Sequence, residues 1–238
     1  MYTSVPMRKK WVFFGWLCTM CYMPFALAGD TLVLLADYWY PINAEPLSGK
    51  EGFGIDLMRG IFKEKNIKID YRITPWKRSI FEVERGIADC IIGADREEAP
   101  HLLYPSEPII MDISAAYHLV GSGLNYQNLD SLLKWRIGLA SGYSYGDAFD
   151  DFVKAHPAPR MLQYVAGDDP LEVNLKKLLA GHIDVILERE VVMQAILKKK
   201  RLNKKVELLA FISDKEGLYI ACSPKKETTK QYLQWWDE

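Results

Sequence analysis

The sequence predicts a two-lobed α/β protein, in which each lobe is a mostly parallel sheet flanked by helices and two strands form the hinge. Segments with the pattern of strands and of helices alternate along the chain, and this alternation occurs twice. Further strand-like runs lie between the two copies and after the second copy, where they could cross from one lobe to the other. Together these features favour parallel α/β sheets over a β-sandwich or a helical bundle.

The first copy begins with a short apolar run, residues 31–36, that is typical of a buried strand. Met58, Ile61 and Phe62 then recur at helical spacing, with charged residues on the opposite side. Alternating apolar and polar residues indicate the next strand. We therefore expect strands over 31–36, 67–73 and 88–93, and helices over 54–65 and 76–85.

The second copy repeats this order, with strands expected over 136–140, 161–165 and 183–187 and helices over 146–155 and 170–180. The copies also match in detail. A glycine that ends a helix is followed three residues later by an aspartate and an apolar strand, as Gly86 and Asp89 in the first copy and Gly181 and Asp184 in the second. This match indicates two similarly wound lobes.

Two crossings divide the chain. Residues 113–120 lead out of the first copy, and residues 206–212 lead back toward the apolar run 217–222. We therefore expect one lobe of residues 29–119 plus 214–238 and a second lobe of residues 120–213. A single doubly wound sheet is the alternative that the chain length permits.

The N-terminal residues predict export. A short cationic patch, residues 8–10, precedes an apolar run that ends in Ala26-Leu27-Ala28. This order is typical of a secretory signal peptide, residues 1–28, with cleavage after Ala28. A retained membrane anchor is the alternative, since the apolar length is borderline for a span.

Composition argues against several kinds of site. The formal net charge is −1 and charges of both signs are interspersed, so no nucleic-acid surface is expected. The basic run 198–201 is interpreted as favourable charge at a helix C-terminus rather than an anion site. The four histidines are scattered, so we expect no metal and no cofactor.

Cys90 and Cys222 remain after removal of the signal peptide, each in an apolar strand-like run. We expect two buried free thiols. One disulfide stays open as an alternative, because an exported protein meets an oxidising compartment.

Ligand-binding candidates follow the strands, since ligands of open α/β sheets bind beyond the C-terminal strand ends. Tyr38 and Trp39 follow the first strand and either stack on a ligand or pack on a neighbouring loop. Trp76 and Arg78 lie in the first turn of the next helix. An arginine there opposes the helix dipole, so it either holds an anionic group or pairs with Glu82 one turn on.

The other candidates follow the third strand and two strands of the second lobe: Ala94, Asp95, Arg96, Tyr143, Ser144, Tyr145 and Glu188. Asp95 and Arg96 offer both signs of charge at one edge of the cleft. The free backbone N–H groups of the loop 141–146 could hold a carboxylate. Glu188, in the position that mirrors Asp95, would suit an ammonium group of the ligand.

Seven short stretches resemble, in order and spacing, the extracellular solute-binding protein family 3, the polar amino-acid type of ABC-transporter receptor. They are GFGIDL (52–57), PWKR (75–78), GIADCIIG (86–93), PSEP (105–108), RIGLASGY (136–143), LLAGHID (178–184) and GLYIA (217–221). The resemblance spans about residues 31–236. It implies a type II periplasmic-binding fold and a monomeric periplasmic protein. It also implies capture of a small polar solute, such as an amino acid, by hinge closure and delivery to the membrane permease of an ABC transporter.

The sequence departs from this family in two places. The family usually carries a Thr-Pro-Glu-Arg-like segment after the third strand, whose arginine holds the ligand carboxylate, whereas residues 95–100 read DREEAP. Arg96 or Arg78 could substitute, or the ligand is not an amino acid. The family also continues past Trp235 and Trp236 with another helix, so we expect part of the last helix to be missing.

Two other functions share this fold by resemblance. A periplasmic enzyme acting on cyclohexadienyl acids would need a general acid or base, for which Glu188, Asp95 or His118 could serve. No pairing of a nucleophile with a base is visible, so we expect a binding protein rather than an enzyme. A sensory module working through a partner receptor is the second alternative.

Overall fold

The computed structural model describes residues 1, 30–156 and 161–238, in which eight strands and seven helices form. The strands are β1 Thr31–Ala36, β2 Lys68–Ile73, β3 Cys90–Ala94, β4 Ile110–Leu119, β5 Ile137–Ala140, β6 Leu162–Val165, β7 Val185–Arg189 and β8 Val206–Cys222. The helices are α1 Phe53–Glu64, α2 Trp76–Glu84, α3 Leu129–Leu132, α4 Asp147–Ala155, α5 Pro170–Leu179, α6 Glu190–Lys200 and α7 Thr229–Asp237. Each strand and helix expected in the two copies forms within two residues of its expected bounds.

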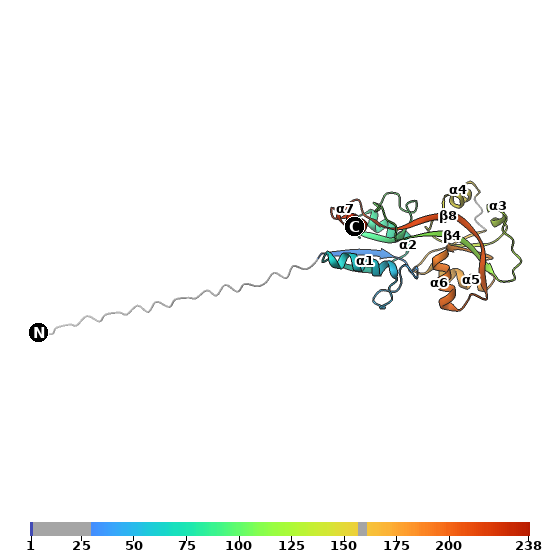
Figure 1. The fold of residues 1–238 in the computed structure, drawn as a ribbon, viewed down its shortest axis with the longest axis horizontal. Helices are drawn as coiled ribbons and strands as arrows, with labels where there is room; N and C mark the ends of the chain where they lie inside the picture. The colour runs from blue at the N-terminus through green and yellow to red at the C-terminus, as the bar shows by residue number, and fades with distance from the viewer. Residues whose placement is uncertain (2–29, 157–160) are drawn as a thin grey trace.

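The strands hydrogen-bond in the order β2-β1-β3-β8-β4-β7-β5-β6. Within this order, β2-β1-β3 is one parallel set and β7-β5-β6 is a second parallel set; we call them the first and second strand sets. They are joined through β8 and β4, two long strands that pair antiparallel from Ile110 opposite Leu218 to Leu119 opposite Val206. Figure 1 shows these two strands running side by side through the middle of the molecule. The predicted two-part α/β architecture is confirmed.

The aspartates of the repeated motif have the same structural role in both sets. Asp89 precedes β3, and its Oδ2 accepts the backbone N–H of Val33 in β1 at 2.7 Å. Asp184 precedes β7, and its Oδ2 accepts the backbone N–H of Arg136, just before β5, at 2.8 Å. Each aspartate therefore ties its own strand to the neighbouring strand, which explains why the two copies share this spacing.

Each strand set is covered by helices that bury an apolar stripe. In α1, Met58 and Phe62 are fully buried, as the helical spacing predicts. The Phe62 ring meets Tyr232 of α7 edge to face, with centroids 5.4 Å apart, so the C-terminal helix completes the core beside β1. In α6 the last turn is basic, which is favourable at a helix C-terminus. Within the described ranges, no helix has the length and apolar character needed to cross a membrane.

Cys90 and Cys222 form a disulfide, which corrects the expectation of two free thiols. The two residues lie directly opposite each other in the antiparallel pairing of β3 with β8. They are 132 positions apart in the sequence, so only the pairing of these strands brings them together. The bond links the first strand set to the long strand that leads back from the second set. Residues 2–28 of the predicted signal peptide lie outside the described residues.

Candidate functional site

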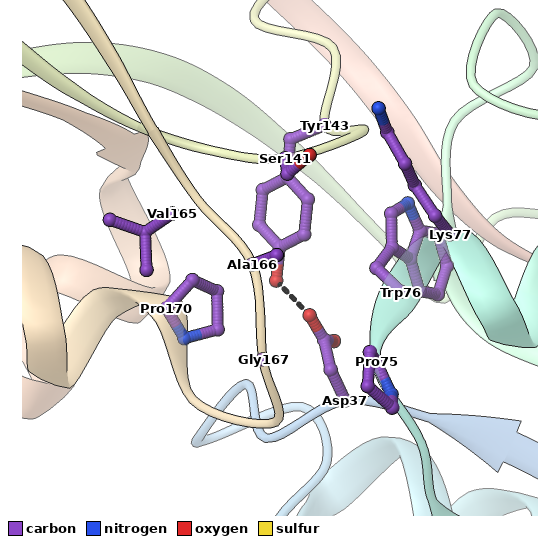
Figure 2. A pocket seen from close by; sticks show the side chains of 10 residues that line it. All are labelled: Asp37, Pro75, Trp76, Lys77, Ser141, Tyr143, Val165, Ala166, Gly167 and Pro170. Carbon is purple, nitrogen blue, oxygen red and sulfur yellow. Dashed lines mark hydrogen bonds between the residues drawn. The ribbon is translucent and has the colours of Figure 1, made fainter.

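A cavity lies where the C-terminal strand ends of the two sets face each other. Its empty volume is about 260 Å³, and its lining comes from both sides: Asp37, Pro75, Trp76, Lys77, Ser141, Tyr143, Val165, Ala166, Gly167 and Pro170 (Figure 2). A smaller space of about 170 Å³ adjoins it and is lined by Asp37, Trp39, Trp76, Gly93, Glu98 and Tyr143. The two share Asp37, Trp76 and Tyr143, and we call them together the crevice. Its location agrees with the rule that ligands bind beyond the strand ends.

Three aromatic side chains form much of the crevice wall. Tyr143 lies between Trp39 and Trp76, with ring centroids 5.6 Å and 6.2 Å away and both contacts edge to face. The two indoles are 6% and 4% exposed. Gly93 has φ +91°, and a Cβ there would come within 3.1 Å of Trp39 Cε3. Glycine at this position therefore allows the indole of Trp39 to lie directly against β3.

Hydrogen bonds cross the crevice from one strand set to the other. The Tyr143 hydroxyl donates to Oδ2 of Asp37 at 2.6 Å, as Figure 2 shows. The indole Nε1 of Trp39 donates to Oε1 of Glu188 at 3.0 Å. Asp37 and Glu188 are only 2% and 3% exposed. These contacts bring Trp39, Tyr143 and Glu188 together, as predicted, and add Asp37, the first residue after β1.

A buried arginine that the sequence analysis missed lies beside the crevice. Arg189 ends β7, is 3% exposed, and donates from Nη2 to Oδ2 of Asp95 at 3.0 Å. Its Nη1 is 2.9 Å from Oε2 of Glu216, a residue of β8. The guanidinium thus links both strand sets and the crossing strand. Its place at a strand end, next to Glu188, is the signal that could have identified it.

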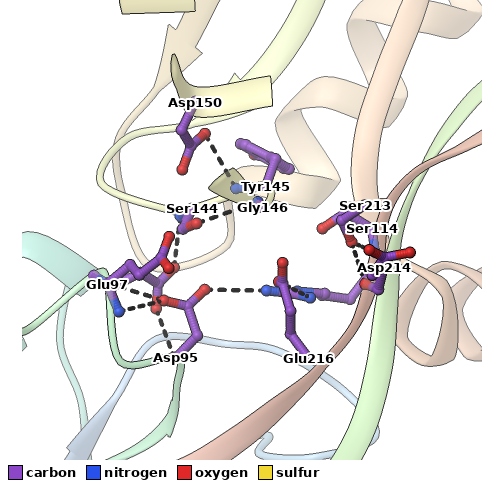
Figure 3. Close-up of polar contacts among 12 residues, drawn as sticks. Asp95, Glu97, Ser114, Ser144, Tyr145, Gly146, Asp150, Ser213, Asp214 and Glu216 are labelled. Atoms are coloured by element: carbon purple, nitrogen blue, oxygen red, sulfur yellow. Dashed lines mark hydrogen bonds and ion pairs between the residues drawn. The ribbon is translucent and has the colours of Figure 1, made fainter. Parts of the chain in front are cut away.

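The backbone N–H groups of the loop 141–146 were expected to hold an anionic group of the ligand, but they have partners within the protein. The backbone N–H of Ser144 donates to Oε1 of Glu98 at 2.8 Å, and that of Tyr145 donates to Oδ1 of Asp150 at 3.3 Å. The N–H of Gly146 donates to the Ser144 hydroxyl at 3.2 Å (Figure 3). The predicted carboxylate seat is therefore occupied by carboxylates of the protein itself.

Burial changes the ionisation of the crevice carboxyl groups. It raises the pKa of Asp37 to about 7, although the hydrogen bond from Tyr143 acts in the opposite direction. It raises the pKa of Glu188 to about 8. Burial and then the charge of Asp95 raise the pKa of Glu98 well above its usual range. Desolvation thus disfavours the charged forms of these acids, which a nearby cation would favour again.

Two predicted residues lie away from the crevice because they have other partners. Arg78 pairs with Glu82 at 2.7 Å and its side chain is 69% exposed, so the surface ion pair forms and the anion-holding role does not. Arg96 donates to the carbonyl of Pro105 at 2.9 Å and its guanidinium lies over the Tyr219 ring, 4.5 Å from the centroid. Neither is placed to hold the carboxylate of a solute in the crevice.

Three more predicted residues have structural contacts. The Tyr38 hydroxyl accepts from Nζ of Lys199 at 2.9 Å, outside the crevice. Ala94 is fully buried in the core beside Trp76. Tyr145 is also buried, and its hydroxyl accepts the backbone N–H of Ala140 at 2.7 Å. Of the predicted candidates, Trp39, Trp76, Tyr143 and Glu188 therefore converge, and Asp95 and Ser144 border them through Arg189 and Glu98.

Comparison with solved structures identifies the fold. The chain superimposes on an arginine-bound variant of ArgBP from T. maritima with a TM-score of 0.72 at 15% identity, covering 88% of this chain and 93% of that one. A histidine kinase sensor domain with similarity to periplasmic binding proteins matches with a TM-score of 0.71 at 17% identity, covering 87% of each chain. The substrate-binding protein of an amino acid ABC transporter matches with a TM-score of 0.68 at 18% identity, covering 87% and 90%.

These likenesses place the chain in the periplasmic-binding-protein fold. No protein-family model matches the sequence, and no curated protein does. At such low identity the shared feature is the architecture, so the solute has to be argued from this chain's own residues.

Proposed function

We propose that this chain is an exported binding protein that captures a small polar solute in the crevice by hinge closure. The observation that carries the proposal is one cavity lined by Trp39 and Trp76 from one strand set and by Tyr143 from the other, with Glu188 of the second set hydrogen-bonded to Trp39. A ligand that touches both sides stabilises the closed arrangement over an open one. The β4–β8 pair would act as the hinge, with lobes of residues 29–119 plus 214–238 and 120–213.

The proposed function also includes export of the protein and delivery of the solute to a transporter. The Cys90–Cys222 disulfide fits an oxidising compartment such as the periplasm, in agreement with the signal peptide that the sequence predicts. The similarity to the substrate-binding protein of an amino acid ABC transporter supports a membrane permease as the partner. The similarity to a histidine kinase sensor domain supports a sensory role as the second candidate.

The binding function is tested with the secreted form, from residue 29 on, and a broad panel of small polar solutes. Thermal shift measures binding, and small-angle scattering measures whether the protein becomes more compact. We expect Trp76→Ala and Glu188→Ala to abolish the ligand-induced shift. Arg78→Ala is the matched control, because that side chain pairs with Glu82 on the surface, and we expect it to bind normally. Normal binding by both crevice variants would place the site elsewhere.

The observation that favours an enzymatic role is the raised pKa of Glu188, because general acids also have raised pKa values. His118 does not support it, since its ring contacts Ser122 at 2.6 Å and lies 3.6 Å from Glu207 rather than in the crevice. Steady turnover of prephenate or arogenate would favour the enzyme. A thermal shift without turnover favours the binding protein.

A further inference from the structure

The crevice region contains more carboxyl groups than cationic groups. Among the described residues, Asp37 and Glu98 line the crevice and Glu188, Asp95 and Glu216 lie beside it, whereas the cations there are the buried guanidinium of Arg189 and the exposed Lys77. The chain as a whole has a formal net charge of only −1, so the imbalance is local. Buried carboxylates are costly unless a cation compensates them.

The one buried guanidinium among the described residues near the crevice is already committed within the protein. Arg189 forms ion pairs with Asp95 and Glu216 at 3.0 and 2.9 Å. Lys77 borders the crevice, but it is an exposed residue that lies over Gly142, where a Cβ would come within 2.6 Å of its Cγ. A carboxylate of a bound solute would therefore meet no free buried cation in the described part of the crevice.

The backbone donors that could hold a solute carboxylate are also committed. Glu98 accepts the N–H of Ser144, and Asp150 accepts the N–H of Tyr145. A solute carboxylate at this loop would have to displace Glu98 and would then lie beside the displaced carboxylate. Like charges at such a distance repel strongly where solvent is excluded.

We propose that the solute captured here is a cation without a carboxylate, such as an alkyl amine or a guanidinium compound; this inference rests on the binding function proposed above. The faces of Trp39, Trp76 and Tyr143 attract a cation, and this attraction increases when the cation is desolvated. Asp37 and Glu98 line the same cavity and supply the countercharge. The cation would compensate carboxylates that the protein leaves without a positive partner.

An unpaired donor beside the cavity adds an independent feature of the solute. Nε1 of Trp76 is buried without a hydrogen-bond partner among the described residues, and the side chain lines both parts of the crevice. A buried donor without a partner is costly, so the bound solute is expected to offer an acceptor there. A hydroxyl on the solute would meet this need without adding negative charge, whereas a protonated amine or a guanidinium has no acceptor.

The test compares pairs of compounds that differ only by the carboxylate. Arginine is compared with agmatine, lysine with cadaverine, and ornithine with putrescine, by thermal shift and by calorimetric titration of the secreted form at pH 7.5. We expect at least one decarboxylated compound to bind at least tenfold more tightly than its amino acid. Equal or tighter binding of the amino acid would show that a carboxylate is accommodated and would overturn the inference.

A charge-removing variant tests the role of the crevice acid. Glu98→Gln retains an acceptor for the Ser144 N–H and removes the negative charge, so we expect it to weaken binding of the preferred amine about tenfold. Glu227→Gln, on an exposed residue outside the crevice, is the matched control and should bind normally. If Glu98→Gln instead strengthens binding of the amino acids, Glu98 is a placeholder for a solute carboxylate and the inference fails.

The two proposals fail separately. If anionic or zwitterionic solutes bind and none of the amines does, the charge assignment is wrong and the binding function stands. If no solute of any charge shifts the melting temperature, the binding function itself fails, together with this inference.

Discussion

The hydroxyl of Tyr143 lies 2.6 Å from Oδ2 of Asp37 and donates to it, although the two residues belong to opposite sides of the crevice. Asp37 directly follows β1, and Tyr143 lies in the loop after β5. The bond therefore joins the two sides of the crevice directly, without any contribution from β4 and β8. It also supplies a hydrogen bond to a carboxyl group that is only 2% exposed.

Removing this hydroxyl should destabilise the closed arrangement. In Tyr143→Phe, the buried Asp37 loses its donor, which typically costs about 1–3 kcal/mol. Urea unfolding measures the loss, and small-angle scattering measures any shift toward a more open shape. Tyr164→Phe is the control, because Tyr164 is 55% exposed. An unfolding free energy equal to that of the unmodified protein would mean that the contact contributes nothing.

The ligand-free protein should lose stability as the pH rises from about 5 to about 8.5. Asp37 and Glu188 have their pKa values raised by burial, from 3.8 to about 7 and from 4.5 to about 8. An acid whose pKa is raised by folding binds its proton more tightly in the folded state. Its contribution to folding stability is therefore full below about pH 4 and is lost as the pH passes through the folded pKa. The groups that surround the two acids are Asp168, Asp169, Tyr143, Trp39 and Arg189.

Thermal melts across this pH range measure the effect. Asp37→Asn should show a smaller fall than the unmodified protein, since one of the titrating groups is gone. His118, whose pKa is lowered by burial, acts in the opposite direction below about pH 6.5 and is present in both proteins. A melting temperature that increases steadily up to pH 8.5 would contradict the assigned protonation of the crevice.

The disulfide allows the number of free thiols and its contribution to stability to be predicted. The secreted form should show no free thiol under native or denaturing conditions until it is reduced, because Cys90 and Cys222 are its only cysteines. Substituting both with serine should cost about 2–5 kcal/mol of unfolding free energy. Thiol titration and urea unfolding measure the two quantities. Two titratable thiols in the unreduced, unfolded protein would restore the original expectation of free cysteines.

Substitution by alanine should have opposite effects on the unfolding free energy at two glycines. Gly93→Ala places a Cβ 3.1 Å from the Trp39 ring at φ +91°, so we expect a loss of about 1–3 kcal/mol. Gly60→Ala, within α1 where a Cβ meets nothing within 4 Å, should gain about 0.5–1 kcal/mol. Chemical unfolding of the two variants provides the comparison. A neutral effect at Gly93 would mean that Trp39 moves aside without cost.

The local pattern of the sequence was sufficient to predict the strands, the helices and the strand ends that carry the crevice. The apolar spacing in α1 and the glycine–aspartate motif before β3 and β7 are short-range features, and the structure retains them. Trp39, Trp76 and Glu188 became candidates because their positions follow from strand order alone. These predictions needed no information on which side chains meet across the crevice.

Only the tertiary structure decided the partners of the charged residues. Arg189 pairs with Asp95 and Glu216, and Cys90 pairs with Cys222. Several acids were equally possible partners of Arg189 in the sequence, and the two cysteines could have stayed free. The outcome depends on distances between segments far apart along the chain. Sequence periodicity records the environment of each residue, whereas pairing depends on the strand arrangement that brings distant residues into contact.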